Sequence, residues 1–337
     1  MEFHPLDEKG AGMADEPVVL TVDLKKYFPS KGGTVKAVDG VDLSVQPGEI
    51  FGFLGPNGAG KTTTLRMLTT LITPDSGKAL VAGFDVSSQP GDVRLNIGYV
   101  GQNGGSDRPA TGRENLILQG RLYGTNRPDA ARRAAELIDL LDLTEFADRI
   151  VYTYSGGQRR RLDVAIGLVN RPKVLFLDEP TTGLDPQNRV NLWTQIEKLK
   201  SEGATIFLTT HYLEEADALS DRLAIMDHGR IVAEGTPESL KREVAHDCIT
   251  IGVAGWKEHV PRLEETLGRR DFVKEVGQEG ERLRVCVRDF AGALPQLMRL
   301  LDEQGVELES VELSETSLDD VFLKKTGYSL RDMTIEE

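Results

Sequence analysis

The sequence has only two cysteines, Cys248 and Cys286, and neither belongs to a CxxC pair or lies near a cluster of histidines. We therefore expect two reduced, partly buried thiols, and neither a disulfide scaffold nor a zinc site. Long apolar runs are also lacking, since none approaches the roughly 20 residues that span a bilayer. The N-terminus has no basic segment followed by an apolar one, which argues against a signal peptide. If the chain works at a membrane, we expect something else to hold it there.

Basic residues are outnumbered, with 40 Lys and Arg against 54 Asp and Glu, so the net charge is −14. Nucleic-acid affinity rests on neutralising phosphates with basic side chains, so this balance argues against nucleic acid as the main partner. Apolar residues make up 39% of the 337 residues and are spread along the chain, which is enough for a packed core. The length is greater than one average domain and less than three.

The order of the expected elements divides the chain. Residues 1–17 are polar, acidic and aperiodic, and we expect a disordered lead-in. From 18 to 245 strands and helices alternate, which predicts a largely parallel α/β sheet covered by helices. A helical stretch interrupts the alternation and predicts an inserted helical subdomain at about 103–157. The expected strands of this domain are Val18–Leu24, Ile50–Leu54, Ile97–Val100, Val174–Leu177, Thr205–Leu208 and Leu223–Met226.

The order of the expected strands and helices changes after a short expected helix at Pro237–Val244. Over residues 246–330 the expected order is strand, helix, hairpin, helix and strand. This β-α-β-β-α-β order predicts a small α+β domain of the ferredoxin-like kind. Residues 331–337 would be a tail.

The sharpest motif is GPNGAGKTT, from Gly55 to Thr63, between an expected strand and an expected helix. It matches the P-loop pattern G-x-x-x-x-G-K-[ST], and its context argues against a chance glycine-rich turn. The backbone N–H groups of such a loop form a nest for phosphate oxygens. Lys61 adds a positive charge, and the Thr62 hydroxyl can ligate Mg²⁺. We therefore expect ATP and Mg²⁺, with ATP held by Asn57, Gly58, Gly60, Lys61, Thr62 and Thr63.

A second motif, KVLFLDEP, ends an apolar strand with Asp178 and Glu179. Ligands of open parallel sheets collect outside the carboxyl ends of the strands. We therefore assign Asp178 to Mg²⁺ and Glu179 to polarising the attacking water. Alone, the pair would more simply be an acidic strand end that caps the next helix. Beside a P-loop it predicts a phosphoryl-transfer site, and the two motifs together predict a P-loop ATPase.

The segment SGGQ resembles the signature motif of ABC-type ATPases, and it comprises Ser155, Gly156, Gly157 and Gln158. It opens an expected helix, so it offers a second helix N-terminus to a phosphate. Alone it would be an ordinary helix cap. The resemblance continues over residues 18–245 with an adenine-stacking aromatic, a Q-loop glutamine, a D-loop aspartate and a switch histidine, which are Tyr27, Gln102, Asp185 and His211. Alone, Tyr27 would more simply be a surface aromatic, Gln102 a loop amide and His211 a capping or core histidine. Their shared order along the chain favours the family.

The resemblance implies a nucleotide site shared between two chains, in which the P-loop of one faces the signature of the other. Because this chain has one of each, we expect a homodimer or a heterodimer with a close relative. The catalytic residues would be Glu179, His211 and Gln102, and Gln102 would also join Thr62 and Asp178 at Mg²⁺. ATP would further contact Tyr27, the four signature residues and Asp185.

The segment VELSETSLDDVFLKKTG, at 311–327, resembles the tail of daunorubicin-resistance-like ABC ATPase subunits, which serve drug, antibiotic and lipid exporters. The alternative is a generic acidic domain for dimer contacts. The resemblance implies a peripheral ATPase on the cytoplasmic face of the membrane, docked on a separate transmembrane permease through the helical subdomain. The alternatives are a soluble ABC ATPase of DNA or ribosomes, disfavoured by the single cassette without a coiled-coil insertion, and a regulatory ATPase. The substrate cannot be derived, because the permease would select it.

Overall fold

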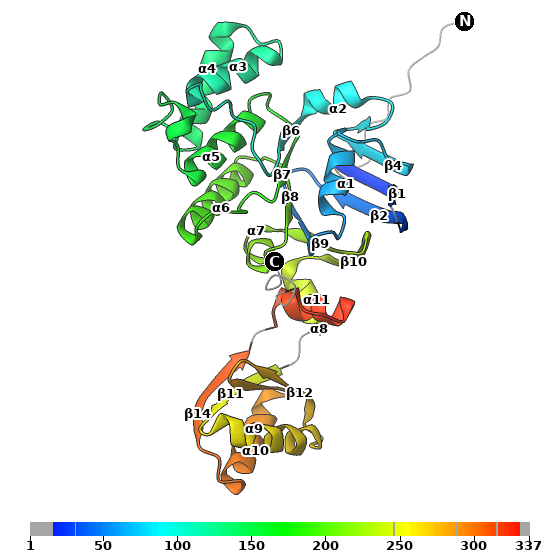
Figure 1. The fold of residues 1–337 in the computed structure, drawn as a ribbon, viewed down its shortest axis with the longest axis vertical. Coiled ribbons are helices and arrows are strands. Elements are labelled where there is room, and N and C mark those ends of the chain that lie inside the picture. The colour runs from blue at the N-terminus through cyan, green and yellow to red at the C-terminus, as the bar shows by residue number, and fades with distance from the viewer. Residues whose placement is uncertain (1–15, 31, 245–246, 288, 315, 331–337) are drawn as a thin grey trace, which may run out of the picture. The chain divides into compact units, whose positions relative to one another are not determined.

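Figure 1 shows the computed structural model, which describes residues 16–30, 32–244, 247–287, 289–314 and 316–330. The chain divides into two compact units, Met1–Pro237 and Glu238–Glu337. This division falls somewhat ahead of the domain boundary expected at 245/246. The expected lead-in over 1–17 lies outside the described residues apart from its last two, and so does the tail. Within the described part of the chain, no helix is both long and apolar enough to cross a membrane.

A six-stranded sheet forms the centre of the first unit, in the order β10-β9-β3-β8-β7-β6. Its neighbouring strands are parallel except for the antiparallel pair β9 and β10. Every residue of β3, β7 and β8 is buried, as parallel strands covered on both faces require. This is the α/β sheet that the sequence predicts. Its strands are β3 (Ile50–Leu54), β6 (Ile97–Val100), β7 (Val174–Asp178), β8 (Ile206–Thr210), β9 (Arg222–Asp227) and β10 (Arg230–Gly235).

The first expected strand, Val18–Leu24, lies in a separate sheet rather than in the parallel one. This four-stranded sheet has the order β2-β1-β4-β5, and its neighbouring strands are antiparallel. Only two residues separate β1 from β2 in the sequence, too few for the crossover that parallel pairing needs, and the two strands pair as a hairpin. The strands are β1 (Val19–Ser30), β2 (Gly33–Val45), β4 (Ser76–Val81) and β5 (Phe84–Asp85).

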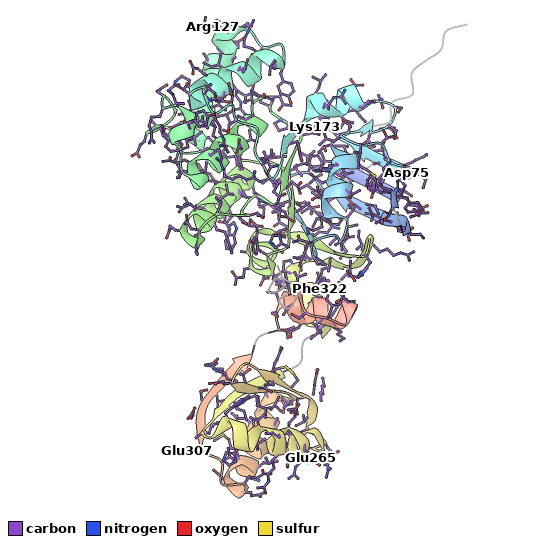
Figure 2. All side chains as sticks on the ribbon, in the orientation of Figure 1. Asp75, Arg127, Lys173, Glu265, Glu307 and Phe322 are labelled. Carbon is purple, nitrogen blue, oxygen red and sulfur yellow. A yellow bond between two sulfur atoms is a disulfide. The ribbon has the colours of Figure 1, made fainter. Side chains whose placement is uncertain are left out.

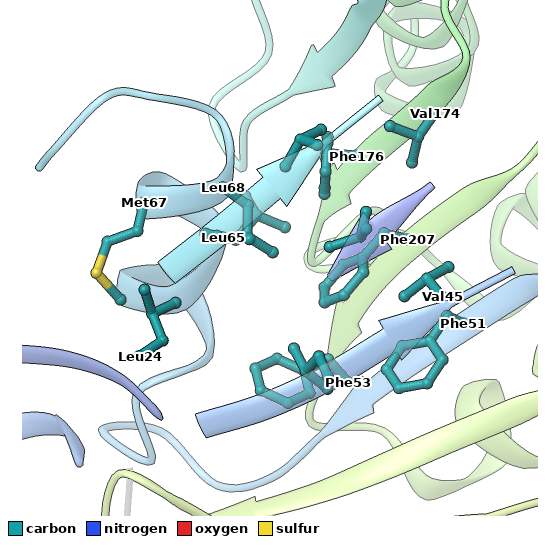
Figure 3. Packing of buried hydrophobic residues seen from close by; sticks show 14 of the residues in the cluster. Leu24, Val45, Phe51, Phe53, Leu65, Met67, Leu68, Val174, Phe176 and Phe207 are labelled. Atoms are coloured by element: carbon teal, nitrogen blue, oxygen red, sulfur yellow. The ribbon is translucent and has the colours of Figure 1, made fainter. Parts of the chain in front are cut away.

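Helices cover both faces of the central sheet, with α1 on one side and α3 to α6 on the other (Figure 1). Side chains alternate along each strand, so each face has its own core. Phenylalanines of β3, β7 and β8 pack toward α1, and Figure 3 shows this cluster. The helices are α1 (Lys61–Leu68), α2 (Pro90–Asn96), α3 (Gly112–Leu122), α4 (Arg127–Leu140), the 3₁₀ turn η1 (Val151–Thr153), α5 (Gly156–Gly167), α6 (Pro186–Ser201) and α7 (Leu213–Leu219).

The second unit contains an antiparallel sheet in the order β12-β13-β11-β14. Helices α9 and α10 pack on it and complete its apolar core. Helix α11, which the sequence analysis did not anticipate, begins at a capping box made by Ser317 and Asp320. The elements are α8 (Pro237–Val244), β11 (Asp247–Val253), α9 (Trp256–Gly268), β12 (Val273–Glu279), β13 (Arg282–Val287), α10 (Phe290–Glu303), β14 (Leu308–Ser314) and α11 (Leu318–Thr326).

The two cysteines form a disulfide, so the expectation of two free thiols is wrong. Cys248 of β11 pairs with Cys286 of β13. The two residues are direct partners in the antiparallel ladder, and both are buried. They lie 38 residues apart in the sequence. Spacing in the sequence does not disclose such a pairing, because the register of two strands brings the sulfurs together.

Candidate active site

The P-loop, Gly55 to Thr63, connects β3 to α1 as the sequence predicts. Gly58 and Gly60 have φ values of 79° and 109°, in the left-handed region that favours glycine. A Cβ on Gly60 would also lie 2.2 Å from the carbonyl oxygen of Ala37. The loop therefore needs glycine here for both backbone and space. Because α1 begins at Lys61, its first N–H groups face the loop and suit a phosphate.

Lys61 is buried, with 3% of its surface exposed. Its Nζ donates to the carbonyl oxygens of Gly55 at 2.7 Å and Pro56 at 3.0 Å, and lies 3.6 Å from Oε1 of Glu179. Burial lowers the pKa of Lys61, while the charges of Glu179 and Asp178 act in the opposite direction. The ammonium thus lies between the phosphate-binding loop and two carboxylates.

Asp178 and Thr62 lie side by side at the end of β7 and the start of α1. Thr62 Oγ1 donates to Asp178 Oδ1 at 3.2 Å, and the Asp178 side chain is buried. A hydroxyl and a carboxylate are hard oxygen donors, which Mg²⁺ prefers. In the described part of the chain, no group of three His, Cys, Asp or Glu side chains could hold a metal. The donor set therefore fits Mg²⁺ if phosphate oxygens and water complete its shell.

Glu179 is the meeting point of the predicted catalytic residues. Its Oε1 lies 3.3 Å from Nδ1 of His211, and its Oε2 accepts from Nε2 of Gln102 at 3.3 Å. Thr182 Oγ1, which the sequence analysis did not single out, also donates to Oε2 at 3.3 Å. Burial raises the pKa of Glu179, but the combined effect of His211, Lys61 and Thr182 outweighs burial, so the net pKa is below its ordinary value. The carboxylate is therefore ionised near neutral pH and able to accept a proton or a hydrogen bond.

The backbone of Glu179 is unusual, with a φ of 44°. A residue with a Cβ pays about 1–2 kcal/mol for this left-handed conformation. Its N–H is held by Thr209, whose carbonyl oxygen and Oγ1 both lie 3.1 Å away. These two bonds oppose relaxation of the peptide and help to set the direction of the carboxylate.

The signature residues start α5 and form their own cap. Ser155 Oγ accepts from the N–H of Gln158 at 3.2 Å, and the Gln158 side chain accepts from the N–H of Ser155 at 3.0 Å. A Cβ on Gly157 would lie 2.2 Å from Oδ1 of Asn188, so this end of α5 packs closely on α6. Ser155 and Gly156 are exposed. The cap bonds of the signature are thus made within it, it packs against Leu184 and α6, and its exposed end at Ser155 and Gly156 faces solvent.

Two other predicted ATP contacts have side chains with partners of their own. Asp185 caps α6 by accepting from the N–H of Asn188 at 2.9 Å. Tyr27 donates its phenol to Asp39 Oδ1 at 2.5 Å, and its N–H donates to Asp75 at 2.7 Å. Asp75 is labelled in Figure 2. The contacts of Tyr27 and Asp185 with ATP stay predictions.

Arg160 is a buried residue of α5 to which the sequence analysis gave no role. Its guanidinium donates to the carbonyl oxygens of Gly101 at 2.7 Å, Asp178 at 3.0 Å and Pro180 at 2.8 Å. It therefore ties the segment before Gln102 to the end of β7. The sequence offers a weak signal, a run of three arginines in which the middle one points inward.

Two family models match the sequence of this chain. Residues 38–182 match the family model described as ABC transporter, and residues 235–326 match the C-terminal domain of DrrA1-3-like ATP-binding proteins. The daunorubicin resistance ATP-binding protein DrrA2 of Streptomyces coeruleorubidus is 45% identical over 90% of this chain and 95% of its own. The Nod factor export ATP-binding protein I of Cupriavidus metallidurans is 41% identical over 88% and 94%.

The solved structures include a dimeric ATP-binding cassette in a post-hydrolysis state, bound to ADP and Pi. It superposes with a TM-score of 0.59 at 24% identity, over 65% of this chain and 98% of its own, and so shares the fold. The P-loop, the carboxylate pair and these similarities lead to one conclusion. The chain belongs to the ABC transporter family, as an ATP-binding subunit of the kind that includes the daunorubicin resistance ATP-binding proteins.

Proposed function

We propose that this ABC ATPase drives export of a drug-like, antibiotic or lipid-like substrate through a separate transmembrane permease, and that it does so as an ATP-bridged dimer. The observation that carries the proposal is the convergence on Glu179. Lys61 of the P-loop, Gln102 after β6 and His211 after β8 all lie within 3.6 Å of its carboxylate. Three separated segments thus meet where a γ-phosphate and an attacking water would lie.

We assign the phosphates of ATP to the P-loop residues from Asn57 to Thr63. Thr62 and Asp178 would hold Mg²⁺, and Gln102 would join them through its amide oxygen. The metal would supply positive charge for the phosphate oxygens during transfer. Glu179 would accept a hydrogen bond from the attacking water and polarise it. His211 lies beside that carboxylate and would contact the γ-phosphate.

A dimer follows from the single, solvent-facing signature of each chain. The N–H of Ser155 is paired with Gln158, but Ser155 and Gly156 are exposed at the N-terminus of α5, where the positive end of the helix dipole suits a phosphate. We infer that it serves the nucleotide held by the other copy, and the dimeric cassette of the same fold supports this arrangement. ATP then favours the closed dimer because its phosphates contact both copies, and hydrolysis removes that preference. The partner copy is this chain or a close relative.

The helical subdomain offers a surface for the permease. Leu118 and Leu122 of α3 are 51% and 73% exposed. Exposed leucines one turn apart on a helix form an apolar stripe, which suits a protein partner. Docking there would hold the chain at the cytoplasmic face of the membrane as a peripheral subunit. The two relatives named for daunorubicin resistance and for Nod factor export support export as the direction.

A mixing experiment tests the shared site. We expect Ser155→Arg to bind ATP through its own P-loop but to hydrolyse it about 10²–10³-fold more slowly, the usual scale for losing one phosphate-contacting group. Lys61→Ala has the complementary defect. Mixed, the two variants form heterodimers with one intact site, and the mixture should regain part of the lost turnover.

The control mixes Ser155→Arg with the Ser155→Arg/Lys61→Ala double variant, which can form no intact site and should regain nothing. Two results contradict a signature that acts on the other copy. One is loss of ATP binding by the Ser155→Arg protein, and the other is turnover at the wild-type rate.

A further inference from the structure

The apolar face of the central sheet becomes polar at the carboxyl ends of two neighbouring strands. Phe176 of β7 is the ladder partner of Phe207 of β8, and two residues later Asp178 is the partner of Thr209. Because side chains alternate along a strand, Asp178 and Thr209 lie on the same face of the sheet as the phenylalanines in Figure 3, two residues nearer the carboxyl ends of their strands. The register of the sheet therefore places the Thr209 hydroxyl directly beside the Asp178 carboxylate.

Thr209 is completely buried, and its hydroxyl makes two described contacts. It donates to Asp178 Oδ1 at 2.7 Å and accepts from the N–H of Glu179 at 3.1 Å. A hydroxyl has one proton to donate, and an amide N–H cannot accept, so the direction of both bonds is determined. One side chain on β8 thus connects the carboxylate of Asp178 to the strained peptide of Glu179.

We propose that Thr209 is a positioning residue for ATP hydrolysis, which holds Asp178 and Glu179 in a fixed relation through its hydroxyl. The inference rests on the roles proposed above for these two acids. Asp178 Oδ1 also accepts from Thr62, so the same chain of hydrogen bonds reaches the P-loop. Removing the Thr209 hydroxyl would leave the site assembled but would loosen both carboxylates.

Satisfying buried groups does not by itself require this hydroxyl. The N–H of Glu179 also donates to the Thr209 carbonyl oxygen at 3.1 Å, and Asp178 retains the Thr62 hydroxyl. Valine has the shape of threonine, favours strands and would extend the apolar face. A hydroxyl at this position therefore indicates that the two carboxylates need a defined geometry, which packing alone would not require.

The test uses full-length Thr209→Val. We expect kcat to fall about 10–100-fold, the scale of one hydrogen bond to a charged group converted to a rate. The Kd for ATP in EDTA should stay unchanged, because the P-loop contacts are intact. The extra affinity that Mg²⁺ gives to ATP should shrink, because Asp178 is less well placed. Thr209→Ser keeps the hydroxyl and should retain most of the wild-type kcat.

Thr205→Val is the matched control. Thr205 is also buried, and its Oγ1 accepts from the N–H of Gly48 at 2.9 Å, away from the carboxylates. It should keep the wild-type kcat. If the valine protein does not fold, Thr209→Ser and Thr209→Ala replace it, since both lose the methyl group and only alanine loses the hydroxyl.

The reference variants are Asp178→Asn and Glu179→Gln. If both are slow while Thr209→Val turns over normally, the inference is wrong and the proposed site stands. An equally slow Thr209→Ser protein, or an equally slow Thr205→Val protein, also overturns it. If the two reference variants turn over at the wild-type rate, the proposed roles of the acids fail and the inference fails with them.

Discussion

Glu179→Gln should bind ATP normally and hydrolyse it about 10²–10⁴-fold more slowly, the usual scale for losing a general base. Glutamine has nearly the same shape, so the neighbours Gln102, Thr182 and His211 keep a side chain to contact. The substitution removes the negative charge of the Glu179 carboxylate, a group whose pKa lies below its ordinary value in this site. A neutral amide cannot take a proton from water. Single-turnover hydrolysis of bound ATP measures the loss directly.

Glu49→Gln is a matched control for this substitution. Glu49 is largely buried in the same unit, and its carboxylate lies 3.1 Å from Arg222, outside the site. Its replacement should leave single-turnover hydrolysis at the wild-type rate. Hydrolysis by Glu179→Gln within a few-fold of wild type would remove the proposed role of this carboxylate.

Lys61→Ala should weaken ATP binding about 10²–10³-fold, because a buried charge that pairs with phosphate is lost. The Lys61 ammonium donates hydrogen bonds to the carbonyl oxygens of Gly55 and Pro56 in the loop. Alanine brings no charge to replace it. Equilibrium titration with a fluorescent ATP analogue gives the dissociation constant. The denaturation midpoint, measured on the same samples, reports whether the fold survives.

Lys198→Ala provides the comparison. Lys198 also donates to a backbone carbonyl oxygen, that of Leu140 at 2.8 Å, but it lies on α6 away from the P-loop. It should bind ATP as the wild type does. Equal ATP affinity in the Lys61→Ala and wild-type proteins would contradict the assignment of the P-loop.

The α/β sheet and its catalytic segments could be predicted because they depend on short stretches of sequence. A P-loop is one continuous motif, and Asp178 and Glu179 end an apolar strand whose limits are visible. The resemblance to ABC-type ATPases gave Gln102, Glu179 and His211 their predicted roles, and each of them follows a strand of the parallel sheet, whose carboxyl ends lie at one edge. The structure places them in contact. Their roles, like the ferredoxin-like assignment of the second unit, stay predictions.

Features that depend on register or on long-range packing escaped the sequence analysis. The pairing of Cys248 with Cys286 follows from the alignment of β11 with β13, which spacing does not reveal. Thr209 falls just beyond the expected strand Thr205–Leu208, and only the ladder of β7 with β8 places it beside Asp178. Arg160 appears in the sequence as part of a charged run, which usually marks a solvated surface. Its three carbonyl partners come from segments that only the folded chain brings together.

Helix α11 differs from these features, because its signals are local and present in the sequence. Ser317 and Asp320 are spaced as a capping box, and the buried Val321 and Phe322 follow directly. Lys324 and Lys325 then occupy the last turn, where cations are favoured. A helix at 318–326 could therefore have been predicted from these local signals alone.

The central claim, that ATP holds two copies of the chain together around Glu179, is tested most directly by sedimentation of the Glu179→Gln protein. With saturating ATP and Mg²⁺ this variant should sediment as a dimer, because bound ATP contacts both copies and is not hydrolysed. The same protein should be monomeric without nucleotide, and adding Ser155→Arg to it should prevent the dimer. A Glu179→Gln protein that binds ATP and Mg²⁺ to saturation yet remains monomeric would contradict the account.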